Sequence, residues 1–196
     1  RPQELLAAAL DLFVERGYAA TRLDDIAKHA GVSKGTLYLY FTNKEDLFMA
    51  MVRETVLPVI GEAEQMVGTF DGPSAELLRD IVRGWWERIG DTKMSGITKL
   101  MMAESGNFPD VAKFYHDEVI ARGNSMICRM LERGIERGEF RSIDVKQTTN
   151  VICASVLMLM MWKHSFDSCR VEPIVPDDYL NNFIDVLLHG VVKEPA

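Results

Sequence analysis

The chain has 196 residues, a net charge of −7 and hydrophobic side chains at 47% of its positions. This composition provides a core for one large or two small domains and excludes a disordered chain. Its three cysteines lack a CxxC pair and zinc-ligand spacing, which excludes a zinc module and indicates a reducing, cytoplasmic location.

The chain opens inside an expected first helix that is amphipathic and charged throughout, without an initiator Met. This is not the pattern of a signal peptide, and we expect residues to precede it. The most apolar run, residues 151–162, is far shorter than the ~20 residues that cross a bilayer, so we expect no membrane contact.

Residues 22–44, RLDDIAKHAGVSKGTLYLYFTNK, have the spacing of a helix-turn-helix. Ala27 is small enough for a second helix to cross closely. Four residues later, Gly31 allows the positive φ of a sharp turn. Ser33 is a good N-cap for the second helix. The alternative is an ordinary helical corner, but five basic residues and only two acids between residues 16 and 44 favour DNA binding.

We expect the second helix to run from Lys34 to about Tyr40, with Leu37 and Tyr40 facing the first helix. The N-terminal residues of a recognition helix enter the major groove. Lys34 can reach a guanine edge or a phosphate, and the small Gly35 lets the backbone approach the DNA. The candidate DNA-binding residues are Arg22, Ser33, Lys34, Gly35, Thr36, Tyr38, Tyr40 and Lys44, of which the two tyrosines could instead fill a helical core. Lys44 begins the next helix, where we expect its cation and the free backbone N–H groups to grip the phosphate backbone.

The run from residue 5 to residue 48 resembles the DNA-binding domain of the tetracycline-repressor (TetR) family. Three segments carry the resemblance: AAxxLFxxxGY from Ala8 to Tyr18, DIAxxAGVSKGTLY, and YFxxKxxL from Tyr40 to Leu47. The resemblance implies an all-helical homodimer, an effector pocket in the C-terminal part and repression. Arg22 departs from the Ser or Thr common in the family, and we expect Thr21 to cap the helix there and Arg22 to contact phosphate.

After the helix-turn-helix segment, the pattern of apolar residues is helical throughout. We therefore expect an all-α protein of about nine helices. We expect a DNA-binding domain at 1–47 and an effector-binding and dimerisation domain at 48–196. The acid load lies on the second part, with a net charge of −1 in residues 1–50 and −6 in 51–196. The expected helices of the second part cover 44–68 with a kink at Pro58, 74–90, 95–105, 108–138, 144–165 and 177–190, with loops at 68–72 and 166–176.

The expected effector pocket takes Met and aromatic residues, which line adaptable hydrophobic sites, from four helices. The candidates are Trp85, Trp86, Met101, Phe114, Tyr115, Met158 and Trp162, with Met102 beside them; the alternative is that they are plain core residues. His116 and His164 lack the partners for a metal site, and we expect no metal and no cofactor.

The helix around residues 151–162 is apolar on nearly every side, so it needs to be covered on every side. We expect the helices near 144–165 and 177–190 to form an isologous dimer interface. The alternative is that 151–162 is the central helix of a monomeric bundle.

These features predict a ligand-responsive transcriptional repressor. We expect it to bind a pseudopalindromic operator as a homodimer and to be released by a small hydrophobic effector. An activator of the same fold remains an alternative, as does a helical module that binds another protein. No nucleophile elbow, phosphate loop or HExxH motif is present in the sequence, so we expect no catalytic residues and no enzyme.

Overall fold

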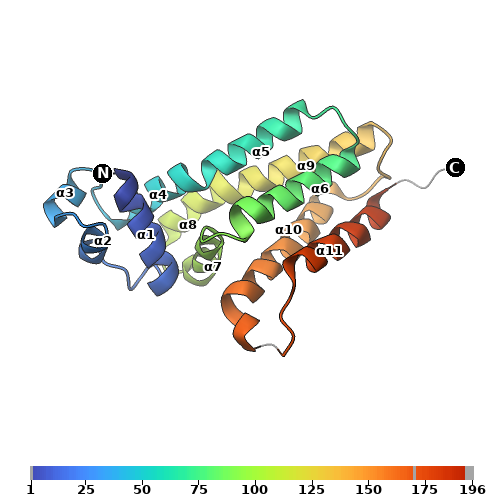
Figure 1. The fold of residues 1–196 in the computed structure, drawn as a ribbon. Helices are drawn as coiled ribbons and strands as arrows, with labels where there is room; N and C mark the ends of the chain where they lie inside the picture. Colours follow the sequence, from blue (N-terminus) through green and yellow to red (C-terminus); the bar gives the residue numbers. More distant parts are fainter. Residues whose placement is uncertain (1, 170, 193–196) are drawn as a thin grey trace. The chain divides into compact units, whose positions relative to one another are not determined.

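The computed structural model describes residues 2–169 and 171–192, and it is helical (Figure 1). Residues 1, 170 and 193–196 lie outside the described residues. The expected domains 1–47 and 48–196 and the expected loop 166–176 each include some of them. The chain forms two compact units. The first unit joins residues 1–59 with 92–120, and the second unit joins 60–91 with 121–196.

The first unit begins with four helices. They are α1 (Pro2–Arg16), α2 (Leu23–His29), α3 (Lys34–Tyr38) and α4 (Lys44–Thr55). Three aromatic rings lie at their centre: Phe13 is 5.4 Å from Tyr18 and 5.6 Å from Phe48 between ring centroids, and Tyr18 is 5.5 Å from Phe48. Each of these side chains is at most 1% exposed. Burial of large rings is a strong stabilising contribution in so small a helical cluster.

Two later helices, α7 (Ser95–Glu104) and α8 (Pro109–Tyr115), complete the first unit. Helix α7 packs on α1, and α8 packs on α4. A Cβ at Gly96 of α7 would lie 2.5 Å from a methyl carbon of Val14 in α1, closer than side chains allow. The absence of a side chain at Gly96 therefore lets the two helices cross at short range.

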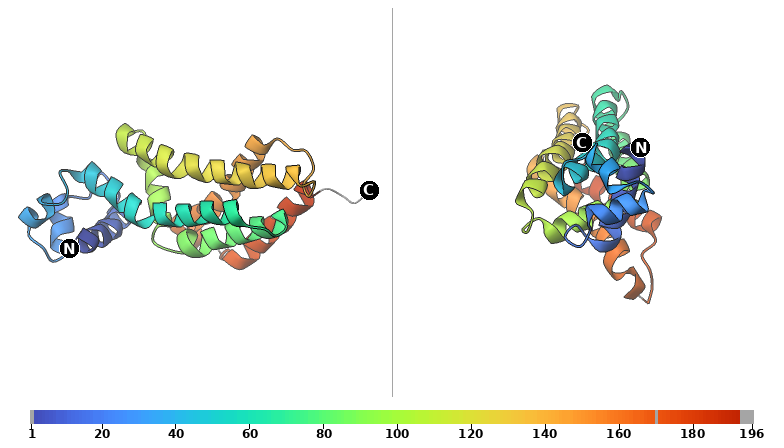
Figure 2. Two further views of the ribbon diagram at one scale, coloured as in Figure 1. Left: turned by 90° about the horizontal axis from the view of Figure 1, so that it is seen from above. Right: turned by 90° about the vertical axis from the view of Figure 1, so that its left-hand side faces the viewer.

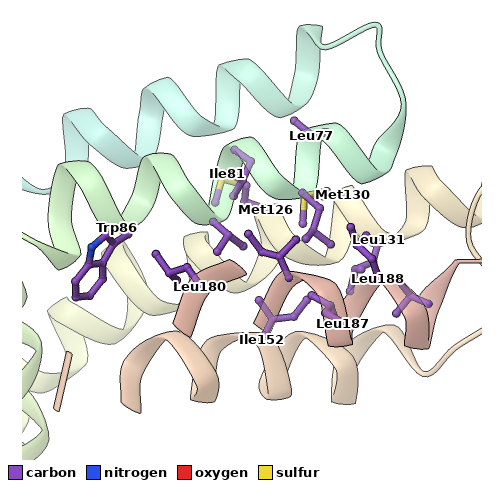
Figure 3. Close-up of a cluster of buried hydrophobic side chains, with 14 of the residues drawn as sticks. Leu77, Ile81, Trp86, Met126, Met130, Leu131, Ile152, Leu180, Leu187 and Leu188 are labelled. Carbon is purple, nitrogen blue, oxygen red and sulfur yellow. The ribbon is translucent and has the colours of Figure 1, made fainter. Parts of the chain in front are cut away.

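The second unit contains α6 (Ser74–Trp85), α9 (Ala121–Glu136), α10 (Val145–Met161), α11 (Pro176–Val191) and most of α5 (Leu57–Thr69). Helix α9 packs against α6 and α10, and α10 packs beside α11 (Figure 1; Figure 2 gives two further views of the fold). Figure 3 shows the core between them, where apolar side chains of four helices point toward one another. The labelled residues are Leu77, Ile81, Trp86, Met126, Met130, Leu131, Ile152, Leu180, Leu187 and Leu188.

The all-helical fold is confirmed, and most expected helices lie within a few residues of the observed ones. The helix expected over 44–68 is divided at Val56, two residues before Pro58. Proline cannot donate to the carbonyl four residues earlier, and its ring clashes with that carbonyl, so the break precedes the proline.

Three expected helices contain a π-helical turn where we expected a regular helix. These turns are Trp86–Gly90, His116–Ile120 and Trp162–Phe166. The second turn separates α8 from α9 within the helix expected over 108–138. A short 3₁₀ turn at Asp167–Cys169 follows the third. Such turns re-aim side chains within otherwise regular helices and are frequent at functional sites.

Two expected local contacts are wrong. Thr21 does not cap α2; its hydroxyl is buried and donates to the carbonyls of Leu12 (3.1 Å) and Gly17 (2.7 Å), so it closes the end of α1 instead. Tyr40 lies beyond the end of α3 and is 45% exposed, so it is not buried against α2 as Leu37 is.

Among the described residues, no helix has both the length and the apolar composition for a membrane span. In the same part of the chain, no cluster of three or more His, Cys, Asp or Glu side chains is placed to hold a metal ion.

Candidate nucleic-acid interface

The turn between α2 and α3 is built as the sequence predicts. Gly31 has a φ of +68°, and the Val32 amide donates to the Ala27 carbonyl at 2.9 Å. A residue with a side chain would be strained at that φ. Ala27 is 2% exposed, which allows α3 to approach α2 closely.

Ser33 caps α3, as expected. Its hydroxyl oxygen accepts a hydrogen bond from the Thr36 amide at 3.0 Å and lies 2.8 Å from the Thr36 hydroxyl. Leu37 is fully buried and holds the helix against the rest of the first unit. The cap and this single core residue together fix a helix of only five residues.

The outer face of α3 presents polar and aromatic groups to solvent. Lys34 and Gly35 are exposed, Thr36 is half-buried, and Tyr38 is 47% exposed. Leu39, which we did not single out, is 81% exposed beside them. The signal was in the sequence, because a residue two positions after the inward-facing Leu37 lies on the opposite side of a helix.

Lys34 is paired within the first unit. Its ammonium lies 2.8 Å from the nearer carboxylate oxygen of Asp24 in α2 and 5.9 Å from the centroid of the Tyr38 ring. The hydrogen bond that Lys34 donates to the Asp24 carboxylate raises the pKa of Lys34. An incoming phosphate or base must therefore replace a carboxylate as the partner of this cation.

Arg22 is the N-cap residue of α2, but its side chain makes no capping hydrogen bond and is exposed. The structure places it at the start of α2 and does not test its contact with phosphate, which stays a prediction.

Lys44 differs from the other candidates, because its ammonium is directed into the first unit. It donates to the carbonyls of Tyr18 at 2.7 Å, Ala19 at 3.3 Å and Thr21 at 3.2 Å. It also lies 4.5 Å from the centroid of the Tyr18 ring. Burial lowers the pKa of Lys44, while Glu45 and Glu104 act to raise it. These contacts favour an internal role over the phosphate contact that we expected.

The start of α4 is closed by its own side chains. The Asn43 side chain accepts from the Asp46 amide at 2.7 Å, and the Asp46 carboxylate accepts from the Thr42 amide at 2.9 Å. This arrangement resembles a capping box, except that Asp46 accepts from the residue before the N-cap Asn43. It occupies polar groups that we expected to be free for the DNA backbone.

The candidate effector residues are divided between the two units. Met101, Phe114 and Tyr115 belong to the first unit. There, the Tyr115 hydroxyl is 3.0 Å from that of Thr98, and the Phe114 ring lies 4.8 Å from the guanidinium carbon of Arg53. Met102, which we placed beside the pocket, is 58% exposed.

The remaining effector candidates lie in the second unit and have different surroundings. Trp86 is buried in the core cluster, and Trp85 packs against that cluster. Trp162 contacts the ring of Phe166 at 5.3 Å between centroids, and Met158 is 52% exposed. The effector pocket stays a prediction.

Comparison with known proteins agrees with the geometry of α2 and α3. Residues 5–51 match the family model "Bacterial regulatory proteins, tetR family", and residues 76–188 match "AefR-like transcriptional repressor, C-terminal domain". Together these two models cover most of the chain.

Two curated relatives are transcriptional regulators. The HTH-type transcriptional repressor KstR2 of Rhodococcus jostii is 29% identical over 195 residues, 98% of this chain and 92% of that protein. The fatty acid metabolism regulator protein of Bacillus subtilis is 27% identical over 154 residues, 78% of each chain. The crystal structure of FadR from Bacillus subtilis in complex with stearoyl-CoA matches with a TM-score of 0.80 at 22% identity, covering 97% of this chain and 99% of that one. At that identity the structural match shows the shared fold.

Proposed function

Since this chain belongs to the tetR family of bacterial regulatory proteins, we propose that it represses transcription by reading a pseudopalindromic operator as a homodimer. A small hydrophobic effector releases it from the DNA. It acts in the cytoplasm, which agrees with its similarity to bacterial transcriptional regulators.

The exposed start of α3 carries this proposal. Ser33 holds the first turn of α3, and Lys34, Gly35 and Thr36 follow it on the surface. A lysine can bond to a guanine edge, a threonine can contact a base or a thymine methyl, and a glycine allows close approach of the backbone. The three residues thus combine base readout with steric access at the end of a helix that enters the groove.

Exposed apolar side chains on α10 and α11 support the dimer. Val151 and Met158 of α10 are 58% and 52% exposed, and Val186 of α11 is 63% exposed. The inner side of α10, which includes Ile152 and Met160, is buried in the core of the second unit. A second copy of this chain would cover the outer side of both helices in an isologous contact, and its two α3 helices would enter grooves about one helical turn apart, ~34–36 Å.

A long-chain acyl-CoA is the effector class that we propose to test first. The similar structure of FadR from Bacillus subtilis was solved with stearoyl-CoA, and a curated relative regulates fatty acid metabolism. Among the candidates in the second unit, Trp85, Met158 and Trp162 are side chains of the kind that can line an adaptable site for an acyl chain. To reverse a 1:99 population, a ligand must prefer one conformation by about 5.5 kcal/mol.

Selection of bound duplexes from a random DNA pool, at near-physiological salt, tests the function. We expect an inverted repeat, and we expect Thr36→Ala to change the preferred base at one position in each half-site. Addition of stearoyl-CoA should release the selected duplex. Recovery of no consensus by the folded protein would contradict the proposal and favour a module that binds another protein, whose apolar contact would depend little on salt.

A further inference from the structure

Residues 17–21 form the turn that joins α1 to α2. Some backbone amides of this turn donate to a side chain and not to a helical carbonyl. The carboxylate oxygen Oε1 of Glu104 accepts hydrogen bonds from the amides of Tyr18 at 3.1 Å and Ala19 at 3.2 Å. Successive amides that converge on one anion form a nest, which a glycine with positive φ commonly opens. Gly17 has that conformation, with a φ of +84°.

Gly17 also leaves room for the carboxylate. A Cβ at this position would lie 3.2 Å from the same Glu104 oxygen, a tighter approach than most side-chain carbons make. The turn is thus shaped for the carboxylate in two ways, by its amides and by its missing side chain.

The carbonyls of the same turn are held from α4. Lys44 donates to the carbonyls of Tyr18, Ala19 and Thr21, as described above. The carboxylate of α7 therefore holds the amide side of the turn, and the ammonium of α4 holds its carbonyl side. Polar backbone groups outside helices need such partners when they are shielded from water.

Helix α7 holds α1 at its other end as well. Lys93, which precedes α7, lies 2.6 Å from the Asp11 carboxylate of α1, and Gly96 packs closely on Val14. Beyond α7, the Phe108 ring lies 4.6 Å from that of Tyr18 between centroids. Helix α7 thus contacts α1 and the following turn along its whole length, and Glu104 makes the hydrogen bonds at the end of α7.

We infer that Glu104 is a positioning residue for DNA recognition: by binding the turn at residues 17–21, it sets where α2 and α3 are presented. This inference rests on the proposed function and names a residue that acts on the same site from outside the segment matched by the DNA-binding family model. Helix α2 begins at Leu23, two residues after the turn, and α3 is held to the unit by one fully buried side chain. A shift of this turn therefore moves the exposed face of α3 that would contact DNA.

The experiment compares two substitutions that differ in what they retain. Glu104→Gln keeps an oxygen at the same reach but loses the charge, whereas Glu104→Asp keeps the charge and withdraws the oxygen by one methylene. We expect Glu104→Gln to bind the selected operator within about threefold of the unsubstituted protein. Glu104→Asp should bind at least about tenfold more weakly, since the two amides lose their acceptor. Glu132→Gln, an exposed position on α9, is the charge-matched control and should bind as the unsubstituted protein does.

Amide hydrogen exchange supplies a readout that general destabilisation would not reproduce. In Glu104→Asp, exchange should accelerate at the amides of Tyr18 and Ala19 while the buried helices of both units keep their protection. Operator affinity equal to that of the unsubstituted protein in Glu104→Asp, or a loss in Glu104→Gln as large as in Glu104→Asp, would overturn the inference. If the unsubstituted protein selects no DNA, the proposed function fails, while faster exchange at Tyr18 and Ala19 in Glu104→Asp still reports the contact with the turn.

Discussion

The ammonium of Lys44 lies 2.7 Å from the carbonyl oxygen of Tyr18 and 4.5 Å from the centroid of its ring. The cation that follows the helix-turn-helix is thereby joined to a residue of the turn after α1, which ends at Arg16. The contact joins the beginning of α4 to the turn before α2. Helices α2 and α3 therefore lie in a stretch of chain whose two ends are bonded to each other.

Lys44→Ala should destabilise the fold and leave the salt dependence of DNA binding unchanged. The ammonium bonds to three carbonyls but is partly exposed, so we expect a loss of about 1–2 kcal/mol in the free energy of unfolding. Thermal unfolding measures this loss, and binding at several salt concentrations measures the slope. A slope that falls by about one counterion would instead establish Lys44 as a phosphate contact.

Asp24→Asn should strengthen binding to every duplex by about two- to tenfold. The substitution removes the carboxylate 2.8 Å from Lys34 and frees that ammonium for the DNA backbone. Asp25→Asn is the matched control, because it removes the same charge from a carboxylate that lies 3.7 Å from Arg16 instead. Fluorescence anisotropy with a labelled duplex measures both variants. Equal gains would mean that only net charge matters and would contradict the role of the Asp24–Lys34 pair.

Gly96→Ala should destabilise the first unit by about 1–3 kcal/mol, because the new methyl group would overlap Val14 where α7 crosses α1. Gly61→Ala in α5 is the control: an added Cβ there meets nothing within 4 Å, and alanine favours helix by about 0.5–1 kcal/mol. Urea unfolding of both variants measures the difference. Val14→Ala should restore part of the stability of Gly96→Ala, and its failure to do so would locate the strain elsewhere.

Glu139→Gln should lower stability near neutral pH and converge with the unsubstituted protein in acid. The Ser74 hydroxyl and amide, together with Arg137, lower the pKa of Glu139 from 4.5 to about 2. A pKa lowered on folding gives stability that is present above 4.5 and is lost as the pH falls from there to about 2. Because the side chain is 28% exposed, we expect only about 1–2 kcal/mol at neutral pH.

Urea unfolding at neutral and acidic pH measures this difference for Glu139→Gln. Glu136→Gln, at an exposed position on α9, is the control and should show no such convergence. A constant difference between Glu139→Gln and the unsubstituted protein at all pH values would contradict the assignment.

Local signals in the sequence predicted the helices and the turn of the candidate interface. The Gly31 turn, the Ser33 cap and the buried Leu37 depend on neighbours within a few residues, so their spacing was sufficient. The contact between Glu104 and Tyr18 joins residues 86 positions apart, and no local periodicity indicates such a pair.

The same limit applies to Thr21 and Lys44. Sequence reasoning assigned both to roles at the beginning of a helix, as a cap and as a phosphate contact. Their partners in the structure are carbonyls at the end of α1 and in the turn behind it. Which of several exposed or buried acceptors a polar side chain reaches depends on helix packing, which is set by the whole unit.

Sedimentation of the protein with its selected operator tests most directly whether two chains read two half-sites through α3. We expect two chains per duplex, binding that falls steeply as salt rises, and much weaker binding to a duplex with only one half-site. One chain per duplex with equal affinity for a single half-site, or binding that does not change with salt, would contradict this expectation.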